Sequence, residues 1–393
     1  MGASERARGL LRLTLAPGLG PVRIARLLEA FGDADRVLRA SPAELARVKG
    51  IGDTTARRAA EGLRAAGALV DDELARVEAA GAHLVAIGED AYPPLLAEIP
   101  GAPPVLTVRG EIRAHADDRY TVAIVGSRRC SAYGVEQAER FAGVLAGAGI
   151  TVVSGGARGI DAAAHRGAMR GGGRTIAVLG CGLAQCYPPE HRDLYDEIAA
   201  GHGAVVSELP MATSPDAELP RPQPDHLRAL ARRGRHRGGR GSGALITARH
   251  ALEDHGREVM AVPGRVDSAG SRGALKLIRD GEAALVIDPG DVIASIERAA
   301  RHHFEGTHAA ISADPTRPAP GEGDPDLFEG GSSDPAPAAN ERQRSLLGAL
   351  DGARTLDELV ALTGLGAAEA RAELTVLEIQ RRVRRAGSRF ERA

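Results

Sequence analysis

From about residue 82 the chain alternates short aliphatic runs with Ala-rich helical segments, and this alternation limits the fold more than any other feature. The runs are HLVAIG, PVLTVRG, TVAIVGS, GITVVSGG, TIAVLG and GAVVSEL, which end in or near Gly, Ser or Glu. Helical segments such as YGVEQAERFAGVLAGAG and GIDAAAHRGAMRGG lie between several of them. Buried aliphatic strands separated by helices predict a Rossmann-like parallel sheet with helices on both faces, over residues 82–300. Ligands of such sheets bind at the carboxyl ends of the strands.

Composition excludes several classes of protein. The 393 residues suffice for two or three domains, and the formal net charge of -2 means that nucleic-acid binding would need local basic patches. The three cysteines, Cys130, Cys181 and Cys186, form no CxxC pair, so neither a disulfide framework nor a structural metal is expected. No apolar run is long enough for a membrane span, and we expect a cytoplasmic protein without a membrane anchor.

The segment 1–80 predicts a small domain of short amphipathic helices. LAPGLGPVRIARLLEAFG and RVKGIGDTTARRAAEGLR each place a Gly-apolar-Gly hairpin before an apolar-periodic helix, as in helix-hairpin-helix (SAM-like) elements. Backbone N–H groups at Gly18 to Gly20 and Gly50 to Gly52 can meet nucleic-acid phosphates in that arrangement. The alternative, that these glycines only cap and turn a helical hairpin, stays open.

The C-terminal third predicts a linker and a third domain. Residues 301–339 are rich in Pro, Gly, Asp and Ser, which is typical of a disordered linker. Residues 340–393 contain three helical segments and a short basic hairpin, the pattern of a winged helix-turn-helix, with Thr355 as the expected N-cap of the second helix. Winged helices bind DNA in some proteins and other proteins elsewhere, so the pattern alone does not choose between the two.

Two glycine loops carry the candidate chemistry. IVGSRRCSAYG follows one predicted strand and supplies Ser127 and Arg128, while VVSGGARGIDAAAH follows the next and places Gly155 and Gly156 before a helix N-terminus. A hydroxyl, a guanidinium and free N–H groups favour an anion such as a phosphate over glycines that merely turn the chain.

The sequence contains neither of the common nucleotide-binding motifs nor a recognisable group of catalytic residues. The chain has neither GxxxxGK[ST] nor GxGxxG followed by an acidic residue after the next strand. Ser154 has no identifiable base, and His165 and His191 stand without a ligand set. We therefore expect no catalytic residues, no metal and no cofactor.

Several longer motifs, in order, resemble one family. IVGSRRCSAYG, VVSGGARGIDAAAHRGAM, IAVLGCGLAQCYPPEH, VVSELP, SGALITARHALEDHGREVMAVPG and LIRDGEAALV are similar to the DNA-processing family called DprA or Smf. The resemblance covers nearly all of the chain except the linker. It implies a non-enzymatic protein that binds single-stranded DNA without sequence preference, forms a homodimer through the Rossmann-like domain and loads RecA recombinase during natural transformation.

The resemblance also assigns candidate DNA-binding residues. In the two glycine loops they are Ser127, Arg128, Gly155, Gly156, Ala157, Gly159 and Asp161, and further along the chain they are Arg221, Ser242, Gly243 and Thr247. Backbone and arginine contacts without base readout suit sequence-independent, salt-sensitive binding. Two smaller departures are His191, where the family's Tyr-Pro-x-x-Asn motif has Asn, and Leu219, where it has Phe.

Residues 222–241 depart from the family altogether. After Pro220 and Arg221, where the family has basic residues and then an aliphatic strand, this chain reads PQPDHLRALARRGRHRGGRG. Reading permitted codons one base later turns 222–227 into Arg-Asn-Arg-Ile-Ile-Ser and 231–240 into Arg-Ala-Val-Val-Val-Ile-Glu-Ala-Gly-Glu. We interpret this stretch as a compensated frameshift, because the shifted frame restores both the basic group and the strand. The rival interpretation is a genuine arginine-rich loop that binds nucleic acid electrostatically.

Two other functions are alternatives for parts of this sequence. The predicted sheet is similar to that of lysine-decarboxylase-like proteins that hydrolyse nucleoside monophosphates, but their Pro-Gly-Gly-x-Gly-Thr loop is absent here. A winged-helix transcription regulator would require sequence preference on duplex DNA.

Overall fold

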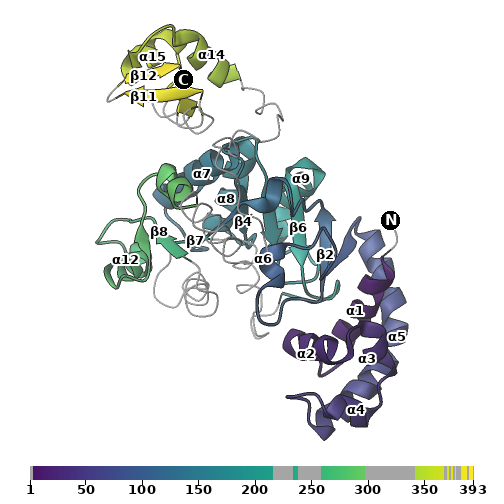
Figure 1. Ribbon diagram of the computed structural model, residues 1–393. Coiled ribbons are helices and arrows are strands. Elements are labelled where there is room, and N and C mark those ends of the chain that lie inside the picture. The colour runs from purple at the N-terminus through teal and green to yellow at the C-terminus, as the bar shows by residue number, and fades with distance from the viewer. Residues whose placement is uncertain are drawn as a thin grey trace, which may run out of the picture. The chain divides into compact units, whose positions relative to one another are not determined.

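A computed structural model describes residues 3–215 and 258–296, the backbone of 233–237, residues 341–366 and parts of 370–392 (Figure 1). The chain divides into two compact units, Met1–Ile287 and Asp288–Ala393. The predicted linker 301–339 and the candidate residues Arg221, Ser242, Gly243 and Thr247 lie outside the described residues.

The first unit begins with five helices, as the hairpin pattern predicted. They are α1 (Glu5–Leu15), α2 (Pro21–Phe31), α3 (Ala34–Arg39), α4 (Pro42–Ala46) and α5 (Asp53–Ala79). Side-chain caps fix several starts: Ser4 accepts a hydrogen bond from the N–H of Ala7, and Ser41 and Glu44 form a reciprocal capping box. Buried Leu13, Ile24, Leu27 and other aliphatic residues from all five helices form one core.

The long helix α5 joins this helical region to the sheet that follows. Its Glu73 is only 4% exposed, and one of its carboxylate oxygens accepts a hydrogen bond of 2.5 Å from the backbone N–H of Met211, beyond the last predicted strand. Met211 also packs in the helical core. The helices and the sheet therefore share buried contacts within one unit.

The six strands expected from the aliphatic runs are present, and the fold class is confirmed. They are β1 (His83–Ala86), β2 (Val105–Gly110), β3 (Thr121–Gly126), β4 (Thr151–Ser154), β5 (Thr175–Val178) and β6 (Gly203–Ser207). With β7 (Arg233–Arg237), β8 (Glu258–Ala261) and β9 (Ala284–Leu285), the sheet has the order β1-β2-β6-β5-β4-β3-β7-β8-β9. The strands from β6 to β9 in this order are parallel, while β1 and β2 form an antiparallel edge that the sequence did not indicate.

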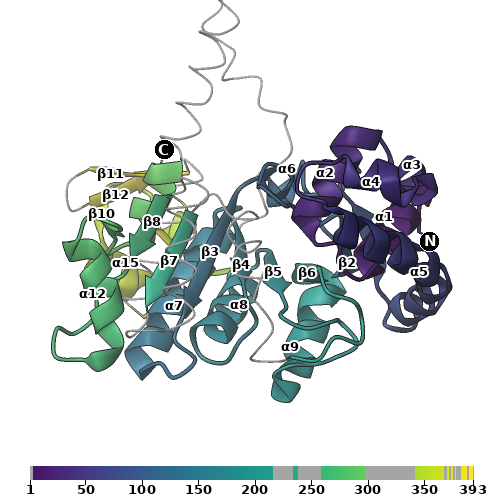
Figure 2. The ribbon, with the colours of Figure 1, turned by 90° about the horizontal axis from the view of Figure 1, so that it is seen from below.

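Alternate residues of the strands pack against different layers. On β5, Ala177 packs with residues of α8 (Ile160–Arg170) and α9 (Arg192–Glu197), whereas Ile176 and Val178 pack with the segment that contains α6 (Pro94–Ala97). The other helices of this region are α7 (Ala132–Gly147), which lies beside α8, and α12 (Arg272–Arg279), as Figure 2 shows. Both faces of the parallel core are covered, as predicted.

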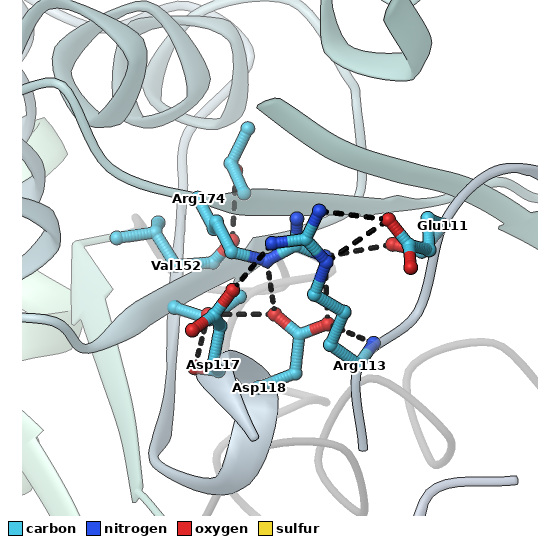
Figure 3. Close-up of polar contacts among 8 residues, drawn as sticks. Glu111, Arg113, Asp117, Asp118, Val152 and Arg174 are labelled. Carbon is cyan, nitrogen blue, oxygen red and sulfur yellow. Dashed lines mark hydrogen bonds and ion pairs between the residues drawn. The ribbon is translucent and has the colours of Figure 1, made fainter. Parts of the chain in front are cut away.

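A buried ion pair ties together the amino ends of the central strands (Figure 3). Arg174, just before β5, donates two hydrogen bonds of 2.9 and 2.8 Å to the two carboxylate oxygens of Asp118. Thr151 donates to the same carboxylate at 2.8 Å, and the backbone N–H of Arg113 donates at 2.7 Å. The Asp118 side chain is 2% exposed, so its charge depends on these partners.

The second unit contains the predicted winged-helix elements. They are α14 (Glu341–Ala349), β10 (Arg354–Thr355), α15 (Leu356–Thr363), β11 (Val383–Ala386) and β12 (Arg389–Arg392), with the three strands in the order β10-β12-β11. Thr355 is the N-cap of α15, as predicted, and exchanges capping hydrogen bonds with Glu358. Most of the third predicted helix lies outside the described residues.

Strand β7 falls inside the stretch interpreted as a frameshift. Its residues read Arg-Gly-Arg-His-Arg, and its backbone pairs in parallel with β3 on one side and β8 on the other. The partner residues Val122 to Val125 and Val259 to Ala261 are buried. A strand between two buried parallel neighbours favours aliphatic side chains. The shifted reading supplies Val-Val-Val-Ile-Glu at these five positions.

We predict that replacing Arg233, Gly234, Arg235 and His236 by Val, Val, Val and Ile stabilises the protein. Each buried aliphatic side chain contributes about 1.5–3 kcal/mol, so thermal melting should shift upward by many degrees. Changing Arg233 and Arg235 to Lys serves as the control and should give no gain. A cooperative melt of the unaltered chain at the temperature of the aliphatic variant would contradict the frameshift interpretation, as would gene DNA without compensating indels across codons 218–245.

We also predict that Arg174→Met lowers the free energy of unfolding in urea by about 3–5 kcal/mol, because it leaves the Asp118 carboxylate buried without its cation. Arg113→Met is the matched control. Arg113 pairs with Glu111 and Asp117 near the surface, so its loss should cost at most about 1 kcal/mol. Equal losses in the two variants would show that the buried pair has no special role.

Candidate nucleic-acid interface

The two glycine loops lie next to each other at one edge of the sheet. β3 and β4 pair in parallel, so the loop that follows Gly126 and the loop that follows Ser154 leave the same edge. Ser131 caps α7 at the end of the first loop by accepting a hydrogen bond from Gly134, and α8 begins at Ile160 directly after the second loop. The sheet therefore brings together the residues that the sequence placed in two separate motifs.

Gly159 is where the two loops touch. Its φ is +79°, and a Cβ at this position would collide with the carbonyl oxygen of Ser127 and lie 2.9 Å from that of Arg128. The next residue, Ile160, donates a backbone hydrogen bond of 3.3 Å to the Ser127 carbonyl. Only glycine satisfies both the conformation and the space.

Gly156 is held from beneath by two side chains. Its carbonyl oxygen accepts hydrogen bonds from the Tyr195 hydroxyl at 2.8 Å and from Nδ1 of His191 at 2.9 Å. Its φ is +66°, and a Cβ would lie 2.7 Å from the Tyr195 hydroxyl oxygen. His191, at the position where the resembled family has Asn, supplies a donor to the loop. Tyr195 was not singled out from the sequence.

Asp161 lies under the loops rather than on their surface. The residue is 7% exposed, and its carboxylate accepts hydrogen bonds from the backbone N–H groups of Ala157, Gly126 and Gly155. Burial raises its pKa to about 7, against the lowering effect of these N–H groups and of the Arg128 charge. Asp161 thus links the starts of both loops through one carboxylate.

Ser127 and Arg128 occupy the first loop at the surface. The Ser127 hydroxyl donates to the Arg129 carbonyl at 2.9 Å and accepts from the Arg129 N–H at 3.1 Å, so it holds the turn in its present form. The exposed arginines are Arg128 and Arg129 in the first loop and Arg158 in the second loop. Three positively charged side chains are therefore exposed on the loops that follow the strand ends. Gly155 and Ala157, in the second loop, are half-buried.

Arg158 and its neighbours were missed by sequence reasoning. Arg158 forms a two-point ion pair with Glu190, and its guanidinium lies 5.9 Å from the centre of the Tyr187 ring. Tyr187 is 41% exposed. A weak signal was present, since Arg158 lies inside the GGARGID loop, but no sequence pattern indicated that residues 187–190 lie beside that loop.

His165 sits within α8, away from this surface. It is fully buried, and its Nδ1 lies 2.7 Å from the Thr175 hydroxyl oxygen, which itself donates to the Val152 carbonyl. Burial lowers the pKa of His165 to about 3, so the ring is neutral. Its role here is to join α8 to the sheet.

The fold and this loop pair define a class: a Rossmann-like α/β protein with a helix-hairpin-helix region, a winged helix and two adjacent loops at the strand ends that are rich in glycine and arginine. Family models match DNA recombination-mediator protein A over residues 83–297, a SAM-like helix-hairpin-helix tandem over 10–65 and a DprA winged helix domain over 331–388. The chain belongs to the DNA recombination-mediator protein A family, also known as DprA or Smf, which takes part in DNA processing and recombination.

Relatives and a solved structure agree with this assignment. The chain is 37% identical to Protein Smf of Escherichia coli over 235 residues, which cover 58% of this chain and 60% of that protein. It is 33% identical to Protein Smf of Synechocystis over 302 residues, 75% of this chain and 74% of that one. The X-ray structure of DprA from Streptococcus pneumoniae matches with a TM-score of 0.63 and 30% identity, covering 75% of this chain and 98% of that one. Within the described residues, no helix is both long and apolar enough to span a bilayer.

We predict a pH effect on stability that depends on Asp161. Its pKa is raised from 3.8 to about 7 in the folded protein. Between about pH 4 and pH 7 the Asp161 carboxyl is therefore protonated in the folded state and ionised in the unfolded state. The contribution of Asp161 to the free energy of unfolding is therefore largest below about pH 4 and decreases as the pH rises to about 7. In urea titrations, the free energy of unfolding should fall less between pH 5 and pH 8 in Asp161→Asn than in the wild type. Asp72→Asn, which changes an exposed carboxylate on α5, should show the same fall as the wild type. Identical pH profiles of the wild type and Asp161→Asn would contradict this assignment.

Proposed function

We propose that this protein binds single-stranded DNA without base preference along the edge formed by the two glycine loops. The observation that carries the proposal is the pairing of these loops, through Gly159 and Asp161, beneath the exposed side chains of Arg128, Arg129 and Arg158. Arginine forms charge-assisted hydrogen bonds with phosphate oxygens. Phosphates are common to every sequence, which fits a site that lacks groups arranged to read a base edge.

The exposed Tyr187 ring adds a stacking surface beside Arg158. Base stacking on an aromatic ring tolerates every base, because every base has a π face. Phosphate contacts carry most of the binding in this proposal, and Tyr187 contributes to single-strand preference because its partner must be an unpaired base.

The proposal extends to handling of the bound strand. We infer that the protein acts as a homodimer through the Rossmann-like domain, delivers single-stranded DNA to RecA recombinase and performs no chemistry on it. The family assignment and the role of that family in DNA recombination support this part. It is tested by whether the protein accelerates RecA filament formation on DNA coated with single-strand-binding protein.

The binding proposal is tested with fluorescence anisotropy on labelled oligo-dT. Arg128→Ala should weaken binding about five- to tenfold near 100 mM salt and lower the slope of log affinity against log salt by about 0.7, the value for one lost phosphate contact on a single strand. Affinity for oligo-dA and mixed sequences should change to the same extent.

Arg170→Ala is the matched control. Arg170 is the last residue of α8, at the end opposite the glycine loops, where it pairs with Glu139. Its loss should leave oligo-dT affinity within twofold of the wild type. Unchanged affinity in Arg128→Ala, or an equal loss in both variants, would place single-stranded DNA elsewhere on the molecule.

A further inference from the structure

One of the three exposed arginines of the strand-end loops is already paired with a carboxylate. The Nε atom of Arg158 donates to one carboxylate oxygen of Glu190, and its Nη2 atom donates to the other at 3.0 Å. Among the described residues, Arg128 and Arg129 take part in no ion pair. Arg158 therefore differs from its two neighbours in having its charge matched within the protein.

The Glu190 carboxylate occupies the part of Arg158 that a phosphate would use. The Nε and Nη2 atoms form a planar fork, and this fork binds the paired oxygens of a carboxylate or of a phosphate in the same way. Both side chains are about half-exposed, at 49% and 53%, so a ligand in solution can reach the pair. A phosphate that takes this fork must first displace Glu190.

The chain on both sides of Glu190 is held to the second glycine loop. Nδ1 of the next residue, His191, lies 2.9 Å from the carbonyl oxygen of Gly156. The Tyr195 hydroxyl lies 2.8 Å from the same oxygen and 3.0 Å from the carbonyl oxygen of Tyr187. These buried contacts keep the carboxylate beside the loop, whereas an ion pair between two unsupported surface side chains is held by nothing else.

The pair persists at neutral pH and contributes little to the fold. The hydrogen bonds from Arg158 lower the pKa of the Glu190 carboxyl below its usual value, so Glu190 stays ionised at neutral pH. Ion pairs as exposed as this one add little to the stability of a protein. Removing the carboxylate should therefore leave the protein folded and change mainly what Arg158 can bind.

We propose that Glu190 is a built-in competitor of phosphate at the strand-end loops. In the free protein it occupies Arg158, and single-stranded DNA binds there by exchanging one of its phosphates for the Glu190 carboxylate. The inference rests on the proposed function, because it concerns the same surface. Exchanging one anion for another yields less binding free energy than filling a free guanidinium, so Glu190 weakens DNA binding. A strand that is held less tightly is also released more readily to a partner.

The experiment measures oligo-dT binding to the full chain by fluorescence anisotropy near 100 mM salt. Glu190→Gln should tighten binding about fivefold, the upper range of what one exposed ion pair is worth. Glu190→Ala removes the same carboxylate in a second way and should give the same gain. Thermal melting near the wild-type temperature checks that each variant is folded.

A second background separates competition for Arg158 from general repulsion of DNA by a negative charge. In an Arg158→Ala background no guanidinium is left to release, so Glu190→Gln should change oligo-dT affinity by less than about twofold. Glu197→Gln is the matched control, since it removes an exposed carboxylate at the last residue of α9. Its affinity should stay within twofold of the wild type.

An equal gain with and without Arg158, an equal gain in Glu197→Gln, or wild-type affinity in both Glu190 variants would overturn the competitor role. Arg128→Ala distinguishes these results from failure of the proposed function. If Arg128→Ala weakens binding while the Glu190 variants do not tighten it, the interface stands and only the competitor role falls. If Arg128→Ala leaves the affinity unchanged as well, both proposals fall.

Discussion

The close approach of Gly159 to the carbonyl of Ser127 is the contact on which the strand-end surface depends. Two parallel strands can end side by side without their loops meeting, but here backbone contacts and one buried carboxylate join the loops. A side chain at Gly159 would push the loops apart and separate Arg128 from Arg158. Backbone geometry, rather than any single cation, therefore decides whether these charges lie close enough together to contact one stretch of phosphates in the proposed interface.

The framework of the fold could be predicted from the sequence because its signals are local. Aliphatic runs that end in or near Gly, Ser or Glu predicted the strands, and Thr355 as an N-cap predicted the start of α15. The position of Asp161 could not be predicted in this way. A carboxylate at a helix start can point outward to solvent or inward to neighbouring N–H groups, and the choice depends on the loop from a different strand. The roles of Tyr195 and Glu190 could not be predicted for the same reason, because their hydrogen-bond partners lie more than thirty residues away in the sequence.

The antiparallel edge and β7 show two different limits of sequence reasoning. The runs that form β1 and β2 were recognised as strands, but strand direction is set by pairing, and β2 runs against β6 through contacts between distant segments. At β7 the backbone pairing and the residue types conflict. The strand pairs on both sides with strands whose residues are buried, but it consists of Arg, Gly and His. Such a conflict between local sequence and global position is a sign of altered sequence or of function, and here the codon pattern favours altered sequence.

Helix α5 has a mechanical consequence for the molecule. It runs without interruption from the second hairpin to Ala79, and the Glu73 carboxylate holds it to Met211 beside the sheet. The twenty-one residues from Gly52 to Glu73 span roughly 30 Å at the helical rise, and an α-helix resists both stretching and compression. α5 is therefore a rigid spacer that keeps the second hairpin at a set distance from the contact between Glu73 and Met211 beside the sheet.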